Sequence, residues 1–80
     1  MEQRRKTLEW HRPSEQLPRS GYGQVLVIVS GSPKKKMGLL NAYELAEYVN
    51  GEGWILEMYP EWNGADVHWW AYLPEYPDEV

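Results

Sequence analysis

Near its C-terminus the 80-residue chain reads Val67-His68-Trp69-Trp70-Ala71-Tyr72-Leu73-Pro74-Glu75-Tyr76-Pro77. These eleven residues hold four aromatic rings and close on two prolines. A buried tryptophan or tyrosine removes about 150–250 Å² of surface from water and keeps a polar edge for a hydrogen bond. The pattern predicts a last strand over residues 67–72, against which the rest of this small chain folds.

Length and composition indicate one small domain over residues 1–80, with residues 1–9 and 78–80 expected to fray. The chain has five tryptophans and six tyrosines but no phenylalanine, so we expect an aromatic core. It has no cysteine, which excludes disulfides, thiolate nucleophiles and cysteine-based zinc sites.

The sequence shows no signal for a membrane or for secretion. No run approaches the roughly 20 apolar residues of a transmembrane helix. The basic start, residues 1–6, is not followed by the apolar stretch of a signal peptide. We therefore expect a soluble protein of the cytoplasm, the host cytoplasm if the gene belongs to a phage, with no membrane partner.

Charge divides the chain into two unlike halves. The first forty residues hold all eight basic residues and three acidic ones, a formal charge of +5, and the last forty hold nine acidic residues and no lysine or arginine. Pairing of neighbouring strands would bring the opposite charges together. Alternatively, the molecule has separate acidic and basic faces, one of which meets a partner.

The clearest single strand is Val25-Leu26-Val27-Ile28-Val29, which is apolar on both faces and therefore suits a central position. Residues 30–38 contain Gly31, Pro33 and three lysines, and predict a polar, exposed connection. The Asn50-Gly51 pair predicts a hairpin turn before a strand over residues 54–59.

Residues 39–49 fit two patterns. With period two, Leu40, Ala42, Glu44, Ala46 and Tyr48 share one face of a strand. With period 3.6, Leu39, Tyr43, Ala46 and Val49 form a helical stripe, with Asn41 as an N-cap and Gly51 as the stop. Alanine, glutamate and leucine slightly favour the helix.

The order of these features resembles the small bacterial and phage proteins of the domain of unknown function 551 family. The features that carry the resemblance are Trp10, Leu17-Pro18, Gly23-Gln24-Val25-Leu26-Val27, Ala46 with Tyr48, Trp54, and Val67-His68-Trp69 with Leu73-Pro74-Glu75 and Pro77. Two departures are the three residues between Trp69 and Leu73, where two are expected, and the unaligned segment 30–45. The resemblance implies a small, mostly β domain of bacterial or phage origin, and no activity.

Taken together, these patterns predict a mainly β fold. We expect one antiparallel β-meander of three to five strands with an aromatic core. The resemblance favours a strand at residues 39–49, and a short helix within 39–50, which would make a small α+β fold, stays open. The residues expected in the core are Trp10, Val25, Val27, Trp54 and Trp69.

No catalytic, cofactor or metal site is predicted. His68 is interpreted as a hydrogen-bonded imidazole at the edge of the core; a metal or general-base role is the alternative. Two histidines without cysteine make a weak zinc site, so we expect no metal and no cofactor. The stretch Gly31–Lys36 lacks the Gly-Lys-Ser/Thr close of a phosphate loop, and Pro33 removes a donor.

A partner-binding surface is the functional hypothesis. Adjacent residues of a strand point to opposite faces, so with Trp69 inside, Trp70 is expected on the surface. The candidate partner-binding residues are Trp62, Trp70, Glu57, Glu61, Asp66, Lys34, Lys35 and Lys36.

We expect a non-enzymatic binding module of phage or bacterial origin that contacts a protein. One analogy is a phage inhibitor of a host defence protein or host enzyme. The alternative is a small-ligand binder, of carbohydrate type, on an exposed aromatic surface, and an enzyme ranks third. The acidic second half argues against a nucleic-acid partner. The oligomeric state is not predicted.

Overall fold

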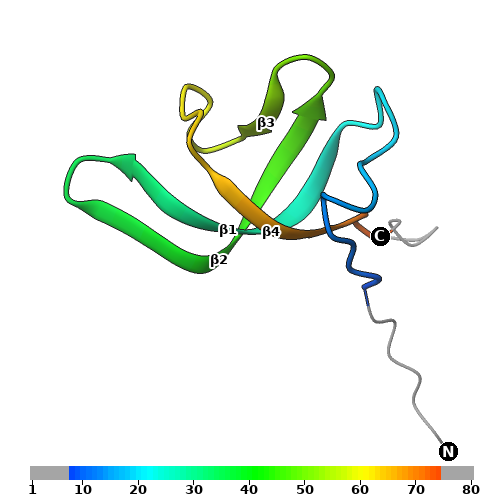
Figure 1. The fold of residues 1–80 in the computed structure, drawn as a ribbon, viewed down its shortest axis with the longest axis horizontal. Coiled ribbons are helices and arrows are strands. Elements are labelled where there is room, and N and C mark those ends of the chain that lie inside the picture. Colours follow the sequence, from blue (N-terminus) through cyan, green and yellow to red (C-terminus); the bar gives the residue numbers. More distant parts are fainter. Residues whose placement is uncertain (1–7, 75–80) are drawn as a thin grey trace, which may run out of the picture.

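Residues 8–74 are described by a computed structural model. They form four strands and no helix: β1 (Gln24–Lys34), β2 (Met37–Val49), β3 (Gly53–Leu56) and β4 (Asp66–Ala71) (Figure 1). All four pair antiparallel in one sheet with the order β3-β2-β1-β4. The predicted antiparallel β fold with aromatic residues in its core is confirmed. Of the ends expected to fray, all but Leu8 and Glu9 lie outside the described residues.

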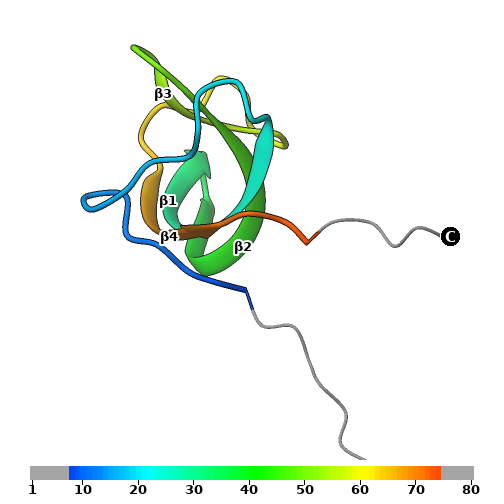
Figure 2. The same cartoon turned by 90° about the vertical axis from the view of Figure 1, so that its right-hand side faces the viewer.

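The order of the strands makes only the first three a meander. The Asn50–Glu52 turn joins β2 to β3, with Gly51 at a φ of 90°. The chain then crosses to the other side, where β4 pairs with β1, which is the Greek-key arrangement. The long β1 and β2 curve, so the sheet wraps around one face (Figure 2).

Residues 39–49 form a strand within β2, as the period-two pattern indicates. The register places Ala46 opposite Val25, Glu44 opposite Val27 and Ala42 opposite Val29. Ala46 is fully buried there. Pairing with β1 and burial of this face outweigh the slight helical preference of the segment.

The connection between β1 and β2 is shorter than predicted. We expected residues 30–38 to be a loop, but β1 continues to Lys34, β2 begins at Met37, and only Lys35 and Lys36 form the turn. Irregularities in the register around Gly31 and before Lys34 accommodate the glycine and the proline within the strand. Gly31 itself has a φ of 137°.

The core lies on the inner face of the curved sheet. Val25, Val27, Val29, Ala46, Leu56 and Trp70 form one buried cluster. Of the predicted core residues, Val25 and Val27 are confirmed, whereas Trp10 and Trp54 are half-buried.

The facing of β4 is the reverse of the prediction: Trp70 is fully buried, and Trp69 is half-exposed. The cause is a bulge opposite the step from Ile28 to Val29. Val67 pairs with Val29, while Trp69 pairs with Ile28, so β4 advances two residues where β1 advances one. Simple alternation would give Val67 and Trp69 the same facing; the bulge moves Trp69 to the outer face and Trp70 to the inner one.

The segment before β1 packs along β4, and its later part contacts Trp70 and Tyr72. His11 pairs with Trp70 through two backbone hydrogen bonds, of 2.8 and 2.9 Å. The Trp70 indole Nε1 donates to the carbonyl of Gln16 at 2.8 Å, and the Arg19 amide donates to the Tyr72 hydroxyl at 2.8 Å. The ring centres of Tyr22 and Tyr72 lie 4.5 Å apart, and those of Tyr72 and Trp70 lie 4.9 Å apart.

Between residues 8 and 74 no helix is long and apolar enough to cross a membrane.

Candidate functional site: an aromatic groove beside the first hairpin

A groove of about 480 Å³ lies between the end of β1 and the loop that follows β3. It is lined by Pro33, Lys34, Met58, Tyr59, Pro60, Glu61 and Trp62. The loop bends twice, because the Tyr59 amide donates to Leu56 and the Trp62 amide donates to Tyr59. These two turns bring the rings of Tyr59 and Trp62 together, with their centres 6.1 Å apart and their planes at 89°. The groove therefore has an aromatic corner.

The absence of a side chain at Gly31 leaves the space that the Trp62 ring occupies. A Cβ on Gly31 would stand 2.6 Å from Trp62 Cζ2, which is closer than carbon atoms pack, and 3.2 Å from Cη2. Trp62 is half-buried and packs against the core. The sequence predicts Trp62 as a partner-binding surface residue, and the structure places one part of its indole on the core and another in the groove.

Charges of both signs line the groove. Lys34 Nζ lies 6.0 Å from the centre of the Tyr59 ring, and Glu61 lines the same hollow. Lys35 and Lys36 form the exposed turn next to Lys34. The sequence suggested the lysine turn and Trp62 as separate candidate surfaces, and the structure brings Lys34, Glu61 and Trp62 together.

The remaining candidates lie elsewhere. Trp70 is fully buried in the core, so its prediction as a surface residue is wrong. Glu57 is exposed and its amide donates to the Leu45 carbonyl at 2.9 Å, outside the groove lining. Asp66 is exposed at the start of β4, beside His68. Sequence reasoning missed Tyr59 and Met58, because nothing in the sequence indicates that the loop after β3 meets the end of β1.

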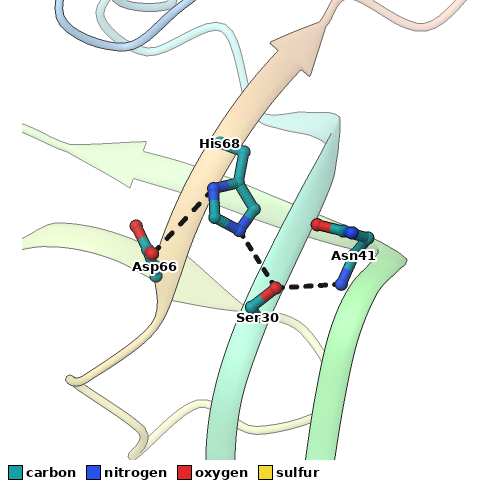
Figure 3. Close-up of polar contacts among 4 residues, drawn as sticks. All are labelled: Ser30, Asn41, Asp66 and His68. Atoms are coloured by element: carbon teal, nitrogen blue, oxygen red, sulfur yellow. Dashed lines mark hydrogen bonds and ion pairs between the residues drawn. The ribbon is translucent and has the colours of Figure 1, made fainter.

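A polar cluster joins the three neighbouring strands β2, β1 and β4 (Figure 3). The main-chain amide of Asn41 donates to Ser30 Oγ at 2.9 Å, and His68 Nε2 lies 3.0 Å from the same oxygen. His68 Nδ1 lies 3.9 Å from Asp66 Oδ2. The interpretation of His68 as a hydrogen-bonded, half-buried imidazole agrees with these contacts.

The cluster contains the residue types of a Ser-His-Asp triad, but its geometry is that of a clamp. The Asp66 contact is too long for a hydrogen bond to orient the imidazole. A main-chain amide already donates to the Ser30 oxygen, and none of the four residues lines either the groove or a smaller hollow on the outer face. A nucleophile needs a substrate site next to donors for an oxyanion. We assign the cluster to holding β4 and β2 against β1 at the bulge.

A second, smaller hollow of about 230 Å³ lies on the outer face of the sheet. It is lined by Trp10, Ile28 and Trp69. The Arg12 guanidinium lies 3.9 Å from the centre of the Trp69 ring and covers it. Tyr43 extends this face, 6.3 Å from Trp10, and is 68% exposed.

Among the residues that the structure describes, no three His, Cys, Asp or Glu side chains are grouped as a metal site would require. No family model matches the chain, and neither does any curated protein or solved structure. The resemblance to the domain of unknown function 551 family therefore rests on the sequence features that suggested it.

Proposed function

We propose that this chain is a non-enzymatic binding module that contacts a partner protein through the groove between β1 and the loop after β3. The observation that carries the proposal is the right-angled pair of Tyr59 and Trp62 with Lys34 beside it. Tryptophan and tyrosine are the residues that most often anchor protein interfaces, because they bury a large area at a small cost in entropy.

The surroundings of the pair favour a peptide segment over a sugar. A sugar stacks on an open ring face, but one part of the Trp62 ring is packed over Gly31 and against the core. The groove offers lysine and glutamate side chains, two prolines and an exposed methionine, a mixture suited to the side chains of a protein. Carbohydrate binding on the same corner is the alternative function.

A bacterial or phage origin, which the resemblance implies, makes bacterial lysate the source in which to seek the partner. The wild-type chain is immobilised, and proteins bound from lysate are identified by mass spectrometry. Met58→Glu is the test variant, because Met58 lines the groove, is 68% exposed, and tolerates a charge without loss of core packing. Tyr43→Glu is the matched control, equally exposed on the outer face.

We expect a protein that binds the wild type and Tyr43→Glu but is lost with Met58→Glu, and a direct titration that reproduces this order. A partner retained by Met58→Glu would place the interface outside the groove. Selective retention of an oligosaccharide by the wild type, with no protein, would favour the alternative function.

A further inference from the structure

The lining of the groove selects the kind of segment that it can hold. Pro33 and Pro60 contribute no backbone N–H, and Tyr59 and Trp62 offer flat apolar surfaces. The amides of Tyr59 and Trp62 are already bonded within the loop, so four of the seven lining residues offer no donor to an added β-strand. The flat rings of Tyr59 and Trp62 suit pyrrolidine rings packed against them. Proline-containing segments dock in aromatic-lined grooves in this way, and their restricted backbone lowers the entropy cost of binding.

The chain itself contains a segment with this chemistry. After β4 it reads Pro74-Glu75-Tyr76-Pro77-Asp78-Glu79. The two prolines are three residues apart, which is one turn of a polyproline helix, so in that conformation they would share an edge. The segment carries three acidic residues and no basic ones, whereas the groove is flanked by Lys34, Lys35 and Lys36. Glu61 is the one acidic residue of the lining, so with the three lysines the groove and its adjoining turn stay net positive and complement the acidic segment.

The groove and the start of this segment lie at opposite ends of the sheet. Ala71 at the end of β4 is opposite Leu26, seven residues along β1 from Pro33, a distance of about 23 Å at about 3.3 Å per residue. Tyr72 is fixed by its hydrogen bond with the Arg19 amide, and Pro74 is exposed. Figure 1 shows β4 running away from the β1–β2 hairpin. Even fully extended, three further residues reach at most about 11 Å, which is too little to return Pro77 to the groove of its own molecule.

We propose that the groove binds the segment from Pro74 to Glu79 of a second copy of this chain. This inference rests on the proposed function, for which it names the partner. The contact is heterologous, since a tail on one molecule enters a groove on the next. Contacts of this type produce closed rings or open chains, and self-association therefore grows with concentration.

The test uses sedimentation velocity of the full chain over a range of concentrations. We expect reversible association of the wild type that is lost both in Met58→Glu, which blocks the groove, and in the double variant Pro74→Ala/Pro77→Ala, which alters the tail. Tyr43→Glu is the control and should associate as the wild type does. Association that persists in both test variants would overturn the proposal, because the contact would then lie elsewhere.

Mixing the two test variants gives a second readout. The tail variant keeps an intact groove, and Met58→Glu keeps an intact tail, so a 1:1 mixture should form a dimer that neither variant forms alone. A synthetic peptide of residues 73–80 should shift the Trp62 indole resonance of the wild type. The same peptide should bind Met58→Glu at least tenfold more weakly than it binds the wild type.

Two results overturn the tail proposal. One is a wild-type chain that stays monomeric at about 1 mM, a concentration that reveals even a weak Kd. The other is a peptide that leaves Trp62 unaffected. If a bacterial protein still binds the groove and is lost with Met58→Glu, the proposed function stands and only its partner has been misidentified. If neither the peptide nor a bacterial protein binds the groove, the proposed function is overturned as well.

Discussion

The indole nitrogen of Trp70 donates a 2.8 Å hydrogen bond to the main-chain carbonyl of Gln16, fifty-four residues earlier. Trp70 is the largest fully buried side chain of the molecule's described part. This bond fastens the segment before β1 to the last strand, alongside the backbone pair of His11 and Trp70. Trp70 thus contributes the largest side chain of the buried cluster and also holds the segment before β1 against β4.

The first prediction follows from this position. Trp70→Phe keeps a buried ring but removes the hydrogen bond and leaves a void, so it should lower the free energy of unfolding by about 2–3 kcal/mol. Trp69→Phe, on the half-exposed outer face, should cost about 1 kcal/mol or less. Urea unfolding measures both. A larger loss at Trp69 would mean that the facing of β4 is not as described.

The facing of β4 also shows where sequence reasoning ends. The first part of β1 could be predicted because four of its five consecutive apolar residues are β-branched, and the hairpin after β2 because Asn50-Gly51 is a strong local signal. The bulge at His68 has no such signal, since it depends on how β4 meets β1 and on the bond between His68 and Ser30. A single added residue reverses every later side chain in the strand.

The groove was predictable only in its parts. Lys34 was a candidate in one loop, and Glu61 with Trp62 in another, because local turn chemistry places both loops at the surface. Their meeting depends on two distant facts: β1 extends five residues beyond Val29, and the loop after β3 crosses over it. Contacts of this kind arise from the topology of the whole sheet.

A second prediction concerns Gly31 beneath Trp62. Gly31→Ala would place a methyl group within 2.6 Å of the indole, at a φ of 137° that side chains rarely adopt. We expect a loss of about 1–3 kcal/mol in unfolding free energy and a shift of tryptophan emission as Trp62 moves. Gly38→Ala is the matched control, because nothing lies within 4 Å of its Cβ position, and it should stay within about 0.5 kcal/mol. Equal effects of the two substitutions would contradict the described seat of Trp62.

A third prediction concerns the polar clamp at Ser30. Ser30→Ala removes the acceptor of the Asn41 amide and the partner of His68 Nε2. We expect unfolding free energy to fall by about 1–2 kcal/mol, with changed NMR signals for the Asn41 amide and the His68 ring. Ser20→Ala, at an exposed turn, should leave stability within about 0.5 kcal/mol. If Ser30→Ala matches this control and the His68 signals do not move, the clamp contributes nothing.

The last prediction uses the opposite charges at the groove. If its ligand is acidic, Lys34 attracts the ligand and Glu61 repels it, so Lys34→Glu should weaken binding of the residue 73–80 peptide and Glu61→Lys should strengthen it. Each change should be about 0.5–1 kcal/mol, two- to fivefold in Kd, and should act mainly on the association rate.

Glu57→Lys is the control for net charge, because Glu57 is exposed but does not line the groove. It alters the total charge as Glu61→Lys does, yet should change Kd by less than that variant. Raising the salt concentration from about 0.05 to 0.5 M should shrink all three differences, since a shorter screening length weakens exposed charge pairs. Titrations at both salt concentrations decide the matter. Equal effects of Glu57→Lys and Glu61→Lys would show a response to net charge alone, and stronger binding in Lys34→Glu would mean that the groove prefers a basic segment.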